Sequence, residues 1–127
     1  MANRFFNQFR FSMEKNVVDL YLKVNIGASG APTIARGKGI ASITRTSAGL
    51  YVITLQDKYH ALLNVQSAVK LASGLPASAL FAISAEAVAT AKTITVQYAD
   101  GDTPAATDPD SGAVLYFTIT LSNSSAL

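Results

Sequence analysis

The residues with the clearest potential for chemistry are four aspartates close together near the C-terminal end: Asp100, Asp102, Asp108 and Asp110. Carboxylate oxygens are the ligands that Ca²⁺ prefers in proteins. An EF-hand loop, however, needs a glycine at its sixth position and a glutamate at its twelfth, and this segment has neither arrangement and contains two prolines. We therefore expect no metal site and no cofactor here.

The single histidine, His60, follows Asp57 by three residues, and a helical turn would bring these two side chains onto one face. No serine elbow or second metal ligand accompanies them, so we interpret the pair as structural. The glycines between residues 27 and 39 match neither a Walker loop nor a dinucleotide fingerprint, and we interpret them as turn residues. The sequence predicts no catalytic residue, no small-molecule substrate and no enzyme; a small hydrolase is the least favoured class because a nucleophile and base pair is missing.

The first residues combine cations with aromatic rings: Arg4 and Arg10 lie among Phe5, Phe6, Phe9 and Phe11. Such a mixture can stack on nucleic acid, but aromatic side chains with arginine are also typical of buried interface centres. Four phenylalanines left in water would promote aggregation. We expect residues 1–14 to be an arm that docks on a neighbouring subunit. An additional core strand of the same domain is the second interpretation, and nucleic-acid binding is the third and unlikely one.

Composition favours one domain, residues 15–127, because 127 residues can bury a sizeable core. Only 14% of the residues are charged and there is no cysteine, so disulfides are excluded and small uncharged side chains must cover much of the surface. No apolar run approaches the ~18 residues of a membrane span, and the N-terminus lacks the apolar core of a signal peptide. We expect no membrane partner and synthesis in a cytoplasm.

Charge is unevenly distributed, since all ten basic residues lie at or before Lys92 while four of the eight acidic residues follow it. This asymmetry could pair identical subunits head to tail or face a partner of opposite charge. A solvated acidic loop is the simpler interpretation.

Alternation of apolar and polar residues predicts an all-β antiparallel fold of six to seven strands, a β-sandwich or a partly closed barrel. In the last strand, residues 115–121, the pattern places Tyr116 on the outer face. The spacing of Ile40 and Ile43 predicts a bulge or a less regular edge, and residues 56–63 are expected to form a helical turn. The remaining expected strands cover residues 18–26, the hairpin 39–55, and residues 65–71, 79–85 and 93–98.

Several of these segments carry a family resemblance: residues 11–15 before a strand, Gly27–Pro32, residues 39–59, and residues 106–112 followed by a strand and Asn123–Ser125. Together they resemble a group of small virion structural proteins of tailed bacteriophages. The resemblance covers most of the chain and is weakest over residues 74–92.

The resemblance implies a homo-oligomeric decoration or cement protein on the outside of an icosahedral capsid, where it would bind the major capsid protein and other copies of itself. A tail- or neck-associated protein, or an adhesion module that uses Tyr116 and residues 99–112, is the alternative. The candidate interface residues are Phe5, Phe6, Phe9, Phe11, Arg4, Arg10, Asp100, Asp102, Asp108, Asp110 and Tyr116.

Deletion of residues 1–12 tests the predicted arm. We expect fewer copies on the capsid and an unchanged sheet, because the deletion removes the aromatic anchors and none of the expected strands. Occupancy measured by electron microscopy of the particle checks this, and unchanged occupancy would contradict the arm assignment.

Overall fold

The fold is all-β in the part of the chain that the computed structural model describes, namely residues 13, 16–71, 79–100, 106–109 and 111–123. A three-residue 3-10 turn, Ala28–Gly30, is the only helical element among these residues. The strands are β1 (Val17–Ile26), β2 (Pro32–Arg36), β3 (Ile40–Ser47), β4 (Leu50–Leu55), β5 (Ala61–Lys70), β6 (Ala79–Ala87), β7 (Thr93–Asp100) and β8 (Val114–Ser122).

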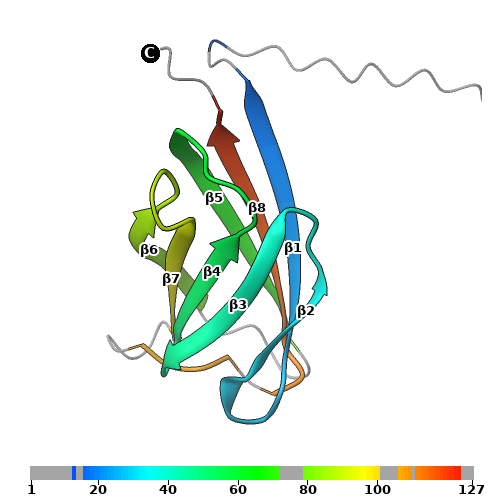
Figure 1. The fold of residues 1–127 in the computed structure, drawn as a ribbon. Coiled ribbons are helices and arrows are strands. Elements are labelled where there is room, and N and C mark those ends of the chain that lie inside the picture. The colour runs from blue at the N-terminus through cyan, green and yellow to red at the C-terminus, as the bar shows by residue number, and fades with distance from the viewer. Residues whose placement is uncertain (1–12, 14–15, 72–78, 101–105, 110, 124–127) are drawn as a thin grey trace, which may run out of the picture.

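The strands form two four-stranded antiparallel sheets, with the orders β2-β1-β8-β5 and β3-β4-β7-β6 (Figure 1). We call them the β1–β8 sheet and the β4–β7 sheet after their central strands. The chain changes sheet between β2 and β3, β4 and β5, β5 and β6, and β7 and β8. The acidic segment thus joins two strands that belong to different sheets.

The core lies between the two sheets and draws on both, because every strand alternates in side-chain direction. On β8, Leu115, Ile119 and Leu121 are completely buried, as the sequence predicts, while Tyr116 between them is exposed. Tyr51 and Ile53 of β4 are equally buried on the facing sheet. One apolar cluster joins these side chains, so each sheet keeps one face for the core and one for its surroundings.

Two expectations about the elements are wrong. Residues 56–63 contain no helical turn: the chain is extended or bent until β5 begins at Ala61, and the His60 amide donates to the Ser122 carbonyl at 3.1 Å. Pairing with β8 satisfies the backbone there, which overrides the local capping signal of Asp57. The described strands number eight, not six or seven, because the short edge strand β2 lacks a long alternating pattern.

Other expectations are confirmed. The ambiguous alanine-rich segment is a strand, β6, and the hairpin of β3 and β4 is present. The strand register shifts between Ile40 and Ser42, which agrees with the predicted bulge or less regular edge. The expected domain limits, residues 1–14 and 15–127, remain a prediction.

Gly49 lies at the tip of the β3–β4 hairpin, where the hairpin meets the backbone at Tyr98 and at Thr107. Its φ is +71°, and a Cβ atom there would lie 2.5 Å from the Tyr98 carbonyl oxygen and 2.7 Å from that of Thr107. The Tyr98 amide donates to the Gly49 carbonyl at 2.8 Å, so β7 already sits against the turn. A side chain at this position would meet backbone atoms that cannot rotate away.

We predict that Gly49→Ala lowers the free energy of unfolding by about 2 kcal/mol or more, because it combines a left-handed φ with contacts to fixed backbone. Gly27→Ala is the matched control, since its φ is −96° and the nearest atom lies at an ordinary 3.6 Å. Urea denaturation of both variants checks this. Equal stability of the two would show that the turn relaxes at little cost.

Candidate functional site

The predicted interface residues divide into two groups. Arg4, Phe5, Phe6, Phe9, Arg10, Phe11, Asp102 and Asp110 lie outside the described residues, and Asp100 is described only as the last backbone position of β7. The side chains of Asp108 and Tyr116 are described, and they have different surroundings.

The Asp108 carboxylate is held by the β3–β4 hairpin. Arg45 donates from Nε to Oδ1 at 2.9 Å and from Nη2 to Oδ2 at 2.7 Å, and the Gly49 amide donates to Oδ1 at 2.8 Å. Gly30 comes so close that a Cβ atom there would lie 2.6 Å from the Asp108 Cγ. We call Asp108, Arg45 and Gly49 the Asp108 clamp.

Electrostatics in the clamp favour the ionised carboxylate. The hydrogen bond from Arg45 lowers the pKa of Asp108 below its ordinary value of 3.8, and the Gly49 amide lowers it further, although desolvation opposes both. Nearby, the Tyr51 hydroxyl donates to the Gly30 carbonyl at 2.8 Å, and burial raises the pKa of Tyr51 to about 12. This end of the acidic segment therefore serves to fasten the crossover between the sheets.

A second feature lies on the outer face of the β1–β8 sheet. Tyr21 of β1 is 63% exposed and Tyr116 of β8 is 40% exposed, so a partner can reach both rings. Tyr21 is opposite Thr118, and Lys23 is opposite Tyr116, so the two rings are diagonal neighbours on adjacent strands. Together with Arg36 of β2, these side chains form what we call the tyrosine face: Tyr21, Lys23, Arg36, Tyr116 and Thr118.

A bulge in the pairing of β1 with β2 brings Arg36 onto this face. Val24 is opposite Ile34, which packs against the core, but the register shifts and Lys23 is opposite Arg36. In an uninterrupted strand Arg36 would share the inward side of Ile34, because side chains two positions apart point the same way. The extra residue, Ala35, reverses the direction of the Arg36 side chain, so Arg36 lies on the outer face with Tyr21 and Lys23.

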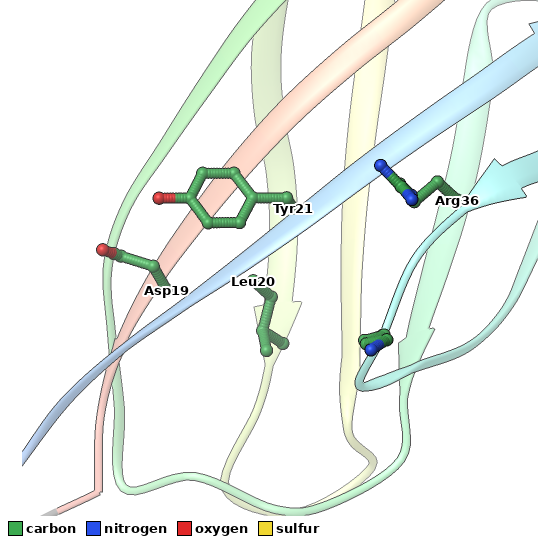
Figure 2. Close-up of a pocket in the computed structure, with 5 residues that line it drawn as sticks. Asp19, Leu20, Tyr21 and Arg36 are labelled. Carbon is green, nitrogen blue, oxygen red and sulfur yellow. The ribbon is translucent and has the colours of Figure 1, made fainter. Parts of the chain in front are cut away.

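The tyrosine face is hollowed on both sides of Tyr21. A hollow of about 550 Å³ is lined by Asp19, Leu20, Tyr21, Arg36 and Lys38, and another of about 350 Å³ lies between Tyr21, Arg36 and Tyr116. Figure 2 shows the Tyr21 ring between the carboxylate of Asp19 on one side and the guanidinium of Arg36 on the other. An aromatic surface with an acid at one end and cations at the other suits a polar partner that also presents apolar area.

The charged side chains of this face and of the larger hollow beside it differ in what they already contact. Lys23 Nζ lies 5.7 Å from the centre of the Tyr116 ring, within the range of a cation–π contact. Asp19 accepts a hydrogen bond from the Thr120 hydroxyl at 2.9 Å. Arg36 and Lys38 form no ion pair with any described residue, so both can meet carboxylates of a partner.

Nowhere in the described ranges do three histidine, aspartate or glutamate side chains gather in a way that could hold a metal ion. The described part of the chain also has no helix of the length and apolarity needed to cross a membrane.

Of the tyrosine face, only Tyr116 was predicted as a candidate interface residue from the sequence. The alternation of Tyr21 and Lys23 with buried leucines was a usable signal for two of the other members. Arg36 could not be placed from the sequence, because its direction depends on the bulge opposite Lys23.

Comparison with known proteins adds no relative: no family model, no characterised protein and no solved structure matches this chain. The resemblance to phage virion proteins therefore stays a prediction.

The variant Asp108→Asn tests the clamp through the pH dependence of its melting temperature. Because the pKa of Asp108 is lowered in the folded state, its charge stabilises the fold well above pH 3.8, and this contribution is lost as the pH falls through the lowered pKa. We predict that Asp108→Asn melts at a lower temperature than the wild type at pH 7 and that the gap narrows on acidification.

Thermal unfolding between pH 2 and pH 7 measures that gap. Asp57→Asn is the matched control, since Asp57 is an exposed carboxylate in the β4–β5 connection. A gap for Asp108→Asn that stays the same at every pH would contradict an ionic clamp.

Proposed function

We propose that this protein is a noncatalytic structural protein of a tailed-bacteriophage virion, a capsid cement or decoration protein that binds the outside of the major-capsid shell. The observation that carries the binding role is the tyrosine face, where two exposed tyrosines lie beside cations that make no ion pair with a described residue. The phage setting rests on the sequence resemblance. In this proposal the fold is a β-sandwich, and residues 1–14 are its arm.

Tyrosine and arginine are the side chains that most often dominate binding energy when a partner covers them. Tyr21 and Tyr116 each offer a rigid ring that loses little conformational entropy on binding, and Arg36 can hold a carboxylate through two parallel hydrogen bonds. The hollows beside Tyr21 give room for protruding side chains of the partner. This combination suits a protein surface with acidic groups around an apolar centre.

Binding of this kind stabilises a shell without any chemical step. A ligand that binds the assembled lattice and not its separated subunits shifts the equilibrium toward the lattice by mass action. Copies that also contact one another would spread this effect over neighbouring capsid subunits, which is why we propose a homo-oligomer. Small-molecule substrates, cofactors and membranes have no part in this proposal.

A tail- or neck-associated protein or an adhesion module is the second candidate. The hollow beside Tyr21 favours it, because an acid, a ring and two cations around a depression could also recognise a polar surface group. The two candidates differ in copy number, since a shell protein covers many equivalent positions and a tail protein occupies few.

Two substitutions on the tyrosine face test the proposed binding surface. We predict that Arg36→Glu and Tyr21→Ser each weaken binding to shells of the phage that encodes this protein by about tenfold or more, because each removes an anchor that the partner would bury. Both side chains are exposed, so the fold should persist. Cosedimentation with purified shells measures the affinity.

Lys58→Glu is the matched control: it makes the same change of charge at an exposed position in the β4–β5 connection. Shell binding that is equally strong in all variants would remove the tyrosine face from the proposal. Absence of wild-type binding to shells, together with binding to tails, would favour the second candidate.

A further inference from the structure

The two sides of the domain, where the edge strands of the sheets approach each other, are closed to different degrees. On the β2–β3 side, Ile40 is only 5% exposed, and the turn between the strands fits tightly over the core. Cβ atoms at Gly37 and Gly39 would lie 2.9 Å from Leu22 and 2.8 Å from Leu20. This side is therefore sealed by the connection between its own edge strands.

Among the described residues, the opposite side, between β5 and β6, is open. Ile83 is opposite the buried Val96, in the inward register, and is nevertheless 44% exposed. Ser67 is opposite the buried Phe117, also in the inward register, and is exposed as well. Val65, Val69 and Phe81 are only partly buried. We call these five residues the open seam: Val65, Ser67, Val69, Phe81 and Ile83.

Aromatic rings lie at the base of the open seam. The Phe81 ring makes edge contacts with Phe117 of the β1–β8 sheet at 5.6 Å and with Tyr98 at 5.2 Å between centres. Because Ser67 is small, no bulky side chain of β5 covers this cluster from the position opposite Phe117. An incoming ring could extend the cluster with the same edge geometry.

Strand β5 also offers backbone to a partner. It has ten residues, Ala61–Lys70, pairs with β8 along one side and is the edge of its sheet on the other. Long edge strands are sites where a further extended segment can add to the sheet. Main-chain hydrogen bonds then give affinity, and pockets for alternate side chains give specificity.

The N-terminal sequence has the pattern that such a site requires. Phe5, Phe9, Phe11 and Met13 occupy odd-numbered positions, while Arg4, Phe6 and Arg10 occupy even-numbered ones. An extended chain would therefore place the first group on one side and both arginines on the other. The segment from Arg4 to Met13 is as long as β5.

The position where this segment joins the domain favours binding to another copy. Met13 is completely exposed, so four residues before β1 the chain has no cover from its own domain. Val17 and Ala61 both pair with Ser122, which places β8 between the start of β1 and the edge of β5. The Asn123 amide also donates to the Asn16 carbonyl at 3.0 Å and keeps the entry to β1 beside the end of β8.

We propose that the N-terminal arm of one copy adds to the β5 edge of a second copy and inserts Phe5, Phe9 and Phe11 into the open seam. The arm would complete the sheet with backbone hydrogen bonds and bury the apolar side chains of both partners. This assembly specifies how copies of the proposed virion protein would contact one another, and it rests on that proposed function. Its test uses purified protein without capsids, so failure here is separate from failure of shell binding.

Sedimentation velocity of three variants tests the arm and the seam separately. We expect the full chain to self-associate and the triple variant Phe5→Ser, Phe9→Ser, Phe11→Ser to associate at least about 100-fold more weakly. Ser67→Arg, a change at an exposed position of the seam, should cause a similar loss. Phe6→Ser is the matched control from the other side of the arm and should change association by less than about threefold. Far-UV circular dichroism verifies that each variant keeps its strands.

Cross-linking decides between a second copy and the same chain, and the absence of cysteine removes any background. In the double variant Phe9→Cys, Ser67→Cys, oxidation should give covalent dimers and larger species. A monomeric full chain, association that survives both the triple variant and Ser67→Arg, or a disulfide formed only within one chain would each overturn the proposal.

Discussion

Apolar contact between two antiparallel sheets is the interaction on which this domain depends. Among the described strands, the ladders of backbone hydrogen bonds stay within each four-stranded sheet. Side chains such as Ile53, Leu115 and Ile119, all completely buried, join the two layers. Each strand can give only one of its two faces to this contact, so the other face of each sheet is left to solvent or to partners. The tyrosine face exists because the fold leaves that side of β1 and β8 uncovered.

The Asp108 clamp adds a specific polar contact to the apolar contact between the sheets. The segment between β7 and β8 must cross from one sheet to the other, and Asp108 fastens it to the hairpin tip through Arg45 and Gly49. An aspartate that the sequence groups with its acidic neighbours thus has a role inside the domain. The clamp also shows why a cluster of like charges in the sequence need not act as one unit in the fold.

Much of the fold could be predicted from the sequence, because alternation with a period of two is a strong and local signal. It correctly predicted the inner and outer sides of β7 and β8. It did not predict β2, which has five residues and forms an edge. The helical turn expected over residues 56–63 from the capping signal of Asp57 was also wrong, because the chain pairs with β8 there.

The candidate site was less predictable, since its members come together only through strand order and register. Arg45 reaches Asp108 across 63 positions of sequence, and no local pattern indicates that partner. Arg36 reaches the tyrosine face because one residue of β2 is bulged. Of the tyrosine face, only Tyr116 was among the candidates predicted from the sequence, since its exposure follows directly from the alternation within a single strand.

We propose that the protein acts by binding to a virion surface, with the exposed face of the β1–β8 sheet turned toward its partner. Electron cryomicroscopy of the phage particle that carries this protein would show which face is buried. We expect many symmetry-related copies on the outer shell, with Tyr21 and Tyr116 buried against the major capsid protein. Copies bound through the β4–β7 sheet with the tyrosines facing solvent, or a particle without this protein on any surface, would contradict it.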